Sequence, residues 1–165
     1  MKEIYTGELN EQYERHGYGH LQNYYEKYSY TGQFINYYPR GQGFHTRNSG
    51  VYEGTFEPNG IIRGKCSYPN GDQYEGEFEY FVPHGRGVKQ HSKDGSTWEG
   101  EWKRGQKNGQ GTISLADGSK QKGKWRNDIP IGIHKYFNKS NCLMGTTDFG
   151  NIKTKVPSKK SVKKK

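Results

Sequence analysis

The sequence is poor in the residues that build a large apolar core. Leu, Ile, Val and Phe together make up only 25 of the 165 residues, and the formal net charge is +9. A chain this polar and charged ordinarily predicts disorder, because it buries too little apolar surface to offset the entropy lost on folding. A large globular core is therefore excluded.

Several motifs that would point to membrane insertion or to chemistry are also missing. No stretch approaches the roughly 20 apolar residues of a membrane helix, and the charged N-terminus lacks the apolar run of a signal peptide. Cys66 and Cys142 lie far apart, without the spacing of a zinc site. Cys142 lies near the end of the array and is expected to be the more exposed of the two, which leaves an intermolecular contact open to it. No phosphate-binding G-x-x-x-x-G-K-S/T occurs, and the six histidines point to no nucleophile with an acidic partner. These absences predict a protein that is not an enzyme and has no metal site and no cofactor.

Aromatic residues and glycines are abundant instead. The chain holds 14 Tyr, 3 Trp and 24 Gly, and the glycines recur at regular intervals. Aromatic rings can supply burial that the aliphatic residues do not. Regular spacing of glycine is not needed in a disordered linker, so these features together predict an ordered chain with a thin, aromatic core.

The spacing defines an internal repeat that opens with aromatic-x-Gly-x-aromatic. Successive copies start 22 to 25 residues apart, and a Gly-x-Gly element follows most of them. Gly64/Cys66 and Gly132/His134 are two broken forms of that element, which suggests that Cys66 replaces a repeat glycine and packs as a small hydrophobic side chain. The copies begin at Tyr5, Tyr30, Tyr52, Tyr74 and Trp98, with a weaker one at Gln121 and a faded one at Leu143.

Within each copy, apolar and charged residues alternate with a period of two, as in Tyr74 to Glu79. That period is typical of a half-buried strand, and Asn-Gly and Asp-Gly pairs between the runs predict tight turns. Each repeat is therefore predicted to be a strand, a turn, a second strand and a turn. The glycine between two aromatics leaves room for a neighbouring ring to lie on the backbone.

Y-x-G-x-F/W followed by G-x-G resembles the MORN repeat (membrane occupation and recognition nexus). We count six repeats and a degenerate closing strand between residues 5 and 149. The resemblance implies an all-β fold: an elongated, single-layer antiparallel β-meander, here of about 12–13 short strands. We expect residues 1–150 to form this array and residues 151–165 to form a separate basic tail.

We predict that the aromatic face of the array binds a protein partner, which we expect to be a helix or peptide. A one-layer sheet has no second layer to cover its apolar face, so that face is available to a partner. Two alternatives are that the array curls until its own rings cover one another, or that it forms a homodimer. The predicted partner-binding residues are Tyr30, Phe34, Tyr52, Phe56, Tyr74, Phe78, Trp98 and Trp102.

On the opposite face, every second strand shows a drift in charge. Glu75 and Glu77 are followed one repeat later by Glu99 and Glu101, and then by lysines. The outer face is therefore predicted to run from acidic to basic along the array. This is either a solubilising face or a docking surface with polarity.

The tail carries seven of the positive charges. Without it, residues 1–150 have a net charge of only +2. The tail is expected to be disordered. Three roles are open for it: solvated charge alone, a nuclear-import signal, or binding to an acidic protein surface or an anionic membrane, which we favour. No nucleic acid is expected to bind, because the body shows no basic patch. The tail-binding residues are Lys153, Lys155, Lys159, Lys160, Lys163, Lys164 and Lys165.

The resemblance also implies a setting. Proteins similar to this one are scaffolds, often at cytoskeletal, ciliary or axonemal structures such as radial spokes. We therefore expect a cytoplasmic, cytoskeleton-associated scaffold or adaptor, with the cilium or flagellum as one location. The alternative is an adaptor that tethers a partner to anionic phospholipids through its tail.

Overall fold

The computed structural model describes residues 3–150 and folds them into a single sheet of thirteen antiparallel strands. No helix forms within those residues. In chain order the strands are β1 Glu3–Leu9, β2 Arg15–Asn23, β3 Tyr28–Ile35, β4 Tyr38–Arg47, β5 Gly50–Glu57, β6 Gly60–Ser67, β7 Gln73–Glu79, β8 Val82–Gln90, β9 Thr97–Lys103, β10 Gln106–Ser114, β11 Lys120–Arg126, β12 Ile129–Phe137 and β13 Leu143–Asp148.

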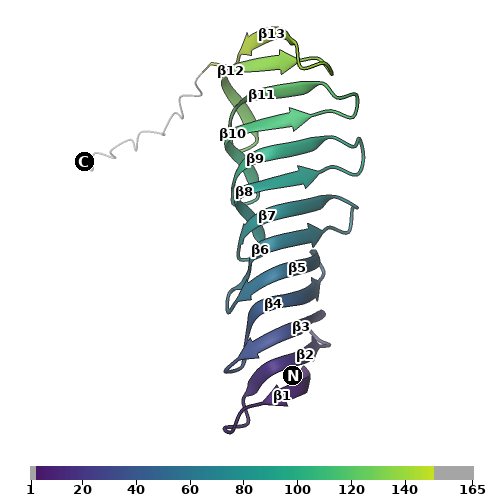
Figure 1. Cartoon of the computed structure of the whole chain (residues 1–165), viewed down its shortest axis with the longest axis vertical. Helices are drawn as coiled ribbons and strands as arrows, with labels where there is room; N and C mark the ends of the chain where they lie inside the picture. Colours follow the sequence, from purple (N-terminus) through teal and green to yellow (C-terminus); the bar gives the residue numbers. More distant parts are fainter. Residues whose placement is uncertain (1–2, 151–165) are drawn as a thin grey trace, which may run out of the picture.

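Every strand pairs only with the strands before and after it in the chain. Figure 1 shows the result, a long and narrow stack that runs from β1 at one end to β13 at the other. The elongated, single-layer antiparallel meander expected from the sequence is therefore confirmed.

A row of directly paired glycines crosses the sheet from β1 to β11. Repeat-opening rings lie across part of this row: a Cβ on Gly87 would overlap the ring of Tyr74, and one on Gly111 would overlap Trp98. For these positions the predicted reason for the repeat glycines is confirmed. At Gly54 and Gly64 a Cβ would instead meet the backbone of the paired strand. The row consists of Gly7, Gly19, Gly32, Gly43, Gly54, Gly64, Gly76, Gly87, Gly100, Gly111 and Gly123.

This register corrects one prediction from the sequence. Gly64 pairs with Gly54 and Gly76, so Gly64 is the repeat glycine of β6. Cys66 lies two residues further along, opposite Tyr52 and Tyr74, and it is 1% exposed within the aromatic core. The prediction that Cys66 replaces a repeat glycine is therefore wrong, although its packing as a small buried side chain is confirmed.

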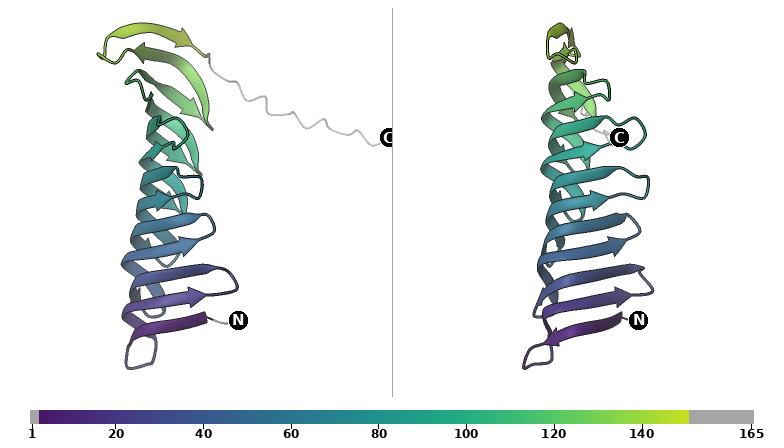
Figure 2. Two further views of the ribbon diagram at one scale, coloured as in Figure 1. Left: turned by 90° about the vertical axis from the view of Figure 1, so that its right-hand side faces the viewer. Right: turned by 45° about the vertical axis from the view of Figure 1, so that its right-hand side comes forward.

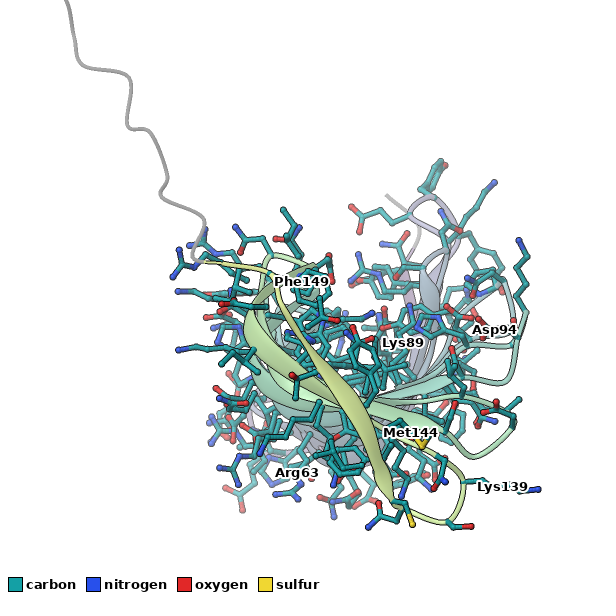
Figure 3. All side chains as sticks on the ribbon, turned by 90° about the horizontal axis from the view of Figure 1, so that it is seen from above. Arg63, Lys89, Asp94, Lys139, Met144 and Phe149 are labelled. Carbon is teal, nitrogen blue, oxygen red and sulfur yellow. The ribbon has the colours of Figure 1, made fainter. Side chains whose placement is uncertain are left out.

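The sheet has two different faces. The inner face carries the repeat aromatics, and the outer face carries the alternate, mostly charged residues. Figure 3 looks along the array and shows Lys89 on the inner side of the sheet and Arg63 on the outer side. The turns that join each odd strand to the next even strand lie along one long side of the sheet, called here the first edge. The turns that join each even strand to the next odd strand lie along the opposite long side, called here the second edge.

The sheet curls until its two edges meet across the inner face. Phe81, in a turn of the first edge, lies with its ring centroid 4.7 Å from the guanidinium carbon of Arg47, at the second-edge end of β4. Arg15 of the first edge likewise forms a 2.7 Å ion pair with Glu3 of the second edge. The curvature, which can be followed in Figure 2, turns the inner face into a trough, called here the inner trough.

Candidate functional site

The floor of the inner trough is a ladder of aromatic rings that joins consecutive repeats. Each repeat-opening ring packs edge to face against the closing ring of the next repeat, at centroid distances such as 5.1 Å for Tyr30 and Phe56 and 5.4 Å for Tyr74 and Trp102. This T-shaped geometry is favourable for aromatic quadrupoles. The other pairs of this kind are Tyr5 with Phe34, Tyr52 with Phe78, and Trp98 with Trp125.

All eight residues predicted to bind a partner belong to this ladder. Their exposed fractions lie between 0% for Trp98 and 6% for Phe78, so they form the core of the sheet. This burial matches the alternative in which the array curls over its own rings. Direct contact of these eight rings with a partner stays a prediction. Tyr30, Phe56, Tyr52 and Trp102 form parts of the walls or floors of two grooves.

The first of these, the N-terminal groove, has a volume of 710 Å³ and lies between the two cross-edge contacts. The Glu3–Arg15 ion pair bounds it toward the start of the chain, and Arg47 with Phe81 bounds it toward the middle. Leu21, Tyr28, Tyr30, His45 and Phe56 contribute buried or half-buried walls. Tyr37 and Tyr38 stand on the rim and are 48% and 57% exposed.

The second, the central groove, has a volume of 400 Å³ and lies on the other side of Phe81. Tyr52, Tyr68 and Trp102 line it, and Tyr80 stands at its rim. Arg47, Ser49 and Phe81 border both grooves, so the Phe81 ring is the partition between them.

Phe81 holds an uncommon backbone conformation to reach this place. Tyr80 and Phe81 form the turn between β7 and β8 with φ values of 50° and 65°. The sign matches a tight hairpin turn, but bulky residues are outliers there and cost on the order of 1–3 kcal/mol. The ring contacts offset this cost: Phe81 packs on His45 at 4.8 Å and Tyr52 at 5.1 Å between centroids.

Three buried or half-buried groups of the inner trough, His45, Tyr30 and Cys66, have pKa values shifted toward their neutral forms. Burial, assisted by the positive charge of Arg47, lowers the pKa of His45 to about 4, so His45 is uncharged at neutral pH. Burial raises the pKa of Tyr30 to about 12, and it also raises the pKa of the Cys66 thiol. The floor of the trough is therefore apolar and uncharged, whereas charged side chains such as Glu3, Arg15 and Arg47 stand around it.

Two carboxylates behave differently, and hydrogen bonds from Tyr28 and Arg15 lower the pKa of the first, Glu3. Burial by itself would raise the pKa of Asp72, but the Ser92 backbone N–H and the Lys89 ammonium outweigh it and hold that pKa well below its usual range. Lys89 lies 3.0 Å from the Asp72 carboxylate, and His91 lies 3.5 Å from it. This cluster links two successive turns of the second edge and is structural in character.

Comparison with known families matches the repeat found in the sequence. The MORN repeat model matches residues 30–51, 63–73, 74–96 and 98–120. The chain is a MORN-repeat protein. It is also 35% identical over 74 residues to MORN repeat-containing protein 3 of Xenopus laevis, a match that covers 41% of this chain and 31% of the relative. The chain thus spans about a third of that relative, and the MORN repeat implies a role in protein or membrane interaction.

The outer face of the MORN array differs from the predicted charge gradient. The prediction considered only the odd strands. The even strands β6 and β8 place Arg63 opposite Glu77 and Arg86 opposite Glu101, so acidic strands alternate with basic ones. The predicted acidic end is therefore mixed in charge. At the other end Lys122 lies opposite Lys135, and that part of the outer face is basic, as predicted. A groove of 770 Å³ follows the glycine row on this face.

Four further features considered in the sequence are Cys142, the tail lysines, a metal site and a membrane helix. Cys142 is exposed, and the lysines predicted in the tail, from Lys153 to Lys165, lie outside the described residues. Among residues 3–150, no group of three or more His, Cys, Asp or Glu is placed to hold a metal ion. Over the same residues, no helix has the length and apolarity to cross a membrane.

Sequence reasoning missed the residues that shape the grooves of the MORN array. Arg47, Phe81 and the Tyr37–Tyr38 pair lie outside the repeat motif, at strand ends and in turns. One signal was present for Phe81: residues 80–81 place two aromatics where a tight turn usually takes Asn, Asp or Gly. Contacts between opposite edges depend on how strongly the sheet curls, which the repeat does not encode by itself.

Proposed function

We propose that this MORN-repeat protein is a non-catalytic scaffold or adaptor that binds a segment of a protein partner, a helix or peptide, in the inner trough. The observation that carries the proposal is the pair of open grooves over the ring ladder, with exposed tyrosines on their rims. Apolar concave surfaces with a few polar groups are the usual sites of ligand and partner binding. The buried rings serve this function by holding the floor rigid.

The proposal extends to the setting. A cytoplasmic, cytoskeleton-associated assembly, with a ciliary or axonemal structure such as a radial spoke as one location, fits what the resemblance to MORN scaffolds implies. The elongated array supports this proposal, because it presents separate surfaces along one molecule. Localisation of the tagged chain in ciliated cells, together with identification of the proteins that co-purify with it, tests the setting independently of the groove.

A pair of matched variants tests the groove. Tyr37→Ala combined with Tyr38→Ala removes two rim rings of the N-terminal groove, whereas Tyr18→Ala removes an equally exposed ring from the outer face. The proposal expects the rim variant to lose the co-purifying partner while Tyr18→Ala retains it, with both variants folded by circular dichroism. Retention of the partner by the rim variant would contradict the proposal.

Membrane tethering is the second candidate function. The basic part of the outer face, where Lys122 lies opposite Lys135, favours this function, and seven lysines follow in residues 151–165. Each lysine near an anionic bilayer contributes about 1 kcal/mol of attraction. Cosedimentation with vesicles of mixed neutral and anionic phospholipid, for chains with and without residues 151–165, tests this. Partner capture that survives the rim variant but is lost with the tail would favour this second function.

A further inference from the structure

Arg47 is a cation held in place by an aromatic ring. Its guanidinium carbon lies 4.7 Å from the centroid of Phe81, and the side chain is exposed at the boundary of the two grooves. No carboxylate of residues 3–150 lies within 4.0 Å of it as an ion-pair partner, whereas Arg15 has Glu3 and Lys89 has Asp72. A stacked guanidinium is preorganised, because its plane is fixed before a ligand arrives.

The surroundings of Arg47 leave its charge available to a partner. His45, its neighbour on the inner face, is neutral at ordinary pH and packs against the same Phe81 ring. Three carboxylates line the groove, and none forms an ion pair with Arg47. Glu3 is hydrogen-bonded to Arg15 and Tyr28, Glu57 pairs with Arg40 at 3.3 Å, and the charge of Glu26 acts on Tyr28, whose pKa it helps to raise. Asn48 and Ser49, the residues that follow Arg47 in the chain, line the same groove and are uncharged.

The N-terminal groove beside Arg47 is apolar at its floor. Leu21, Tyr30 and Phe56 are buried there, and the 710 Å³ volume is large enough for a bulky side chain and part of its backbone. An apolar anchor placed on this floor brings the next polar side chain of the same segment to the groove boundary, where Arg47 stands.

We propose that the N-terminal groove receives a partner segment in which an apolar or aromatic anchor is accompanied by an acidic side chain, and that Arg47 binds this carboxylate. The inference deepens the proposed function and rests on it. Guanidinium and carboxylate match in geometry, and charge-assisted hydrogen bonds of this kind are about twice as strong as neutral ones. The Phe81 ring acts as the positioning surface for Arg47.

Peptide selection tests the proposal with random peptides as the probe. A displayed library is selected on the immobilised full chain, on Arg47→Glu, and on Arg63→Glu as a control that reverses an arginine of the outer face. Clones that lose binding to the Tyr37→Ala, Tyr38→Ala variant define groove binders. The wild type and the control are expected to enrich Asp or Glu beside Leu, Phe or Trp, and Arg47→Glu is expected to enrich Lys or Arg.

One selected peptide then measures how much the contact with Arg47 contributes to affinity. Replacing its acidic residue by the matching amide is expected to raise Kd about tenfold on the wild type and on Arg63→Glu, but less than about twofold on Arg47→Met, which keeps an apolar stem against Phe81. Unfolding midpoints near the wild-type value establish that each variant is folded.

The outcomes separate the two proposals. Groove binders without an acidic preference, or with the same preference on Arg47→Glu, would overturn the role of Arg47 and leave the proposed function intact. Absence of any groove-dependent clone would overturn both. Self-association of the chain in sedimentation velocity that disappears in Arg47→Glu would also overturn the inference, because a second copy would then be the occupant.

Discussion

His134 lies in the place of a repeat glycine and is held by Gln121, whose amide nitrogen is 2.8 Å from the histidine Nδ1. The other ring nitrogen, Nε2, is 2.9 Å from the carbonyl oxygen of Lys124. A carbonyl only accepts, so Nε2 carries the proton and Nδ1 accepts the hydrogen bond from Gln121. In this repeat Gln121 replaces the opening aromatic, and His134 supplies the missing ring against Trp125 at 4.4 Å.

Gln121 and His134, which both depart from the repeat, should therefore be coupled in their effect on stability. His134→Gly should leave a cavity beside Trp125 and cost about 2–5 kcal/mol of unfolding free energy, and Gln121→Tyr should crowd His134. The double variant restores the arrangement of the other repeats, so it should be more stable than the sum of the single changes by about 0.5–3 kcal/mol. Urea unfolding of all four chains measures this coupling, and strict additivity would refute compensation.

The glycine row should tolerate no side chain where a ring lies across it. Gly111→Ala places a Cβ in the volume of the Trp98 ring, so we expect a loss of about 1–3 kcal/mol, typical of overpacking. Gly145 in β13 has nothing within 4 Å of its hypothetical Cβ and serves as the matched control. Thermal or urea unfolding compares the two alanine variants, and equal midpoints would show that ring contact is not what requires glycine.

His45 should make the array sensitive to mild acid. Its pKa is about 4 in the folded chain and near 6.5 when unfolded, so between these values the unfolded state binds more protons. The stability of the array should therefore fall as pH decreases from about 6.5 to about 4. His45→Phe should flatten the loss in this window, and the exposed His16→Gln should not. Denaturant midpoints measured across this pH window test the prediction. If stability depends on pH as steeply in His45→Phe as in the wild type, the buried, neutral state of His45 is contradicted.

Asp72 should act in a lower pH window. Its pKa is depressed in the folded chain, so the stabilisation it provides is complete above its unfolded pKa of about 4 and is lost as the pH falls through the folded value. Asp72→Asn should cost about 1–3 kcal/mol at pH 7, because the ion pair with Lys89 is lost. The difference from wild type should shrink below pH 4. Glu11→Gln, in an exposed turn, is the control for the urea measurements.

Much of the fold could be predicted because the repeat is local. Period-two alternation around Tyr74 marks a strand, the spacing to Gly85 and Gly87 marks its partner strand, and adjacent strands then pair without long connections. The register at β6 could not be predicted with the same reliability. Gly64 and Cys66 are two residues apart and lie at equivalent points of the alternation, so the pattern does not say which of them belongs to the glycine row. The pairing of Gly64 with Gly54 and Gly76 shows that it is Gly64.

The sequence by itself determined the strands, their order, the set of rings that face inward and, except at β6, the glycine row, because each of these follows from spacing within one or two repeats. The tertiary structure decided that these rings bury one another, and that the inner trough keeps its two grooves on either side of Phe81. The contact of Arg47 with Phe81 joins residues from different repeats and opposite edges. Such contacts depend on the accumulated curl of many strands, and no local pattern specifies that curl.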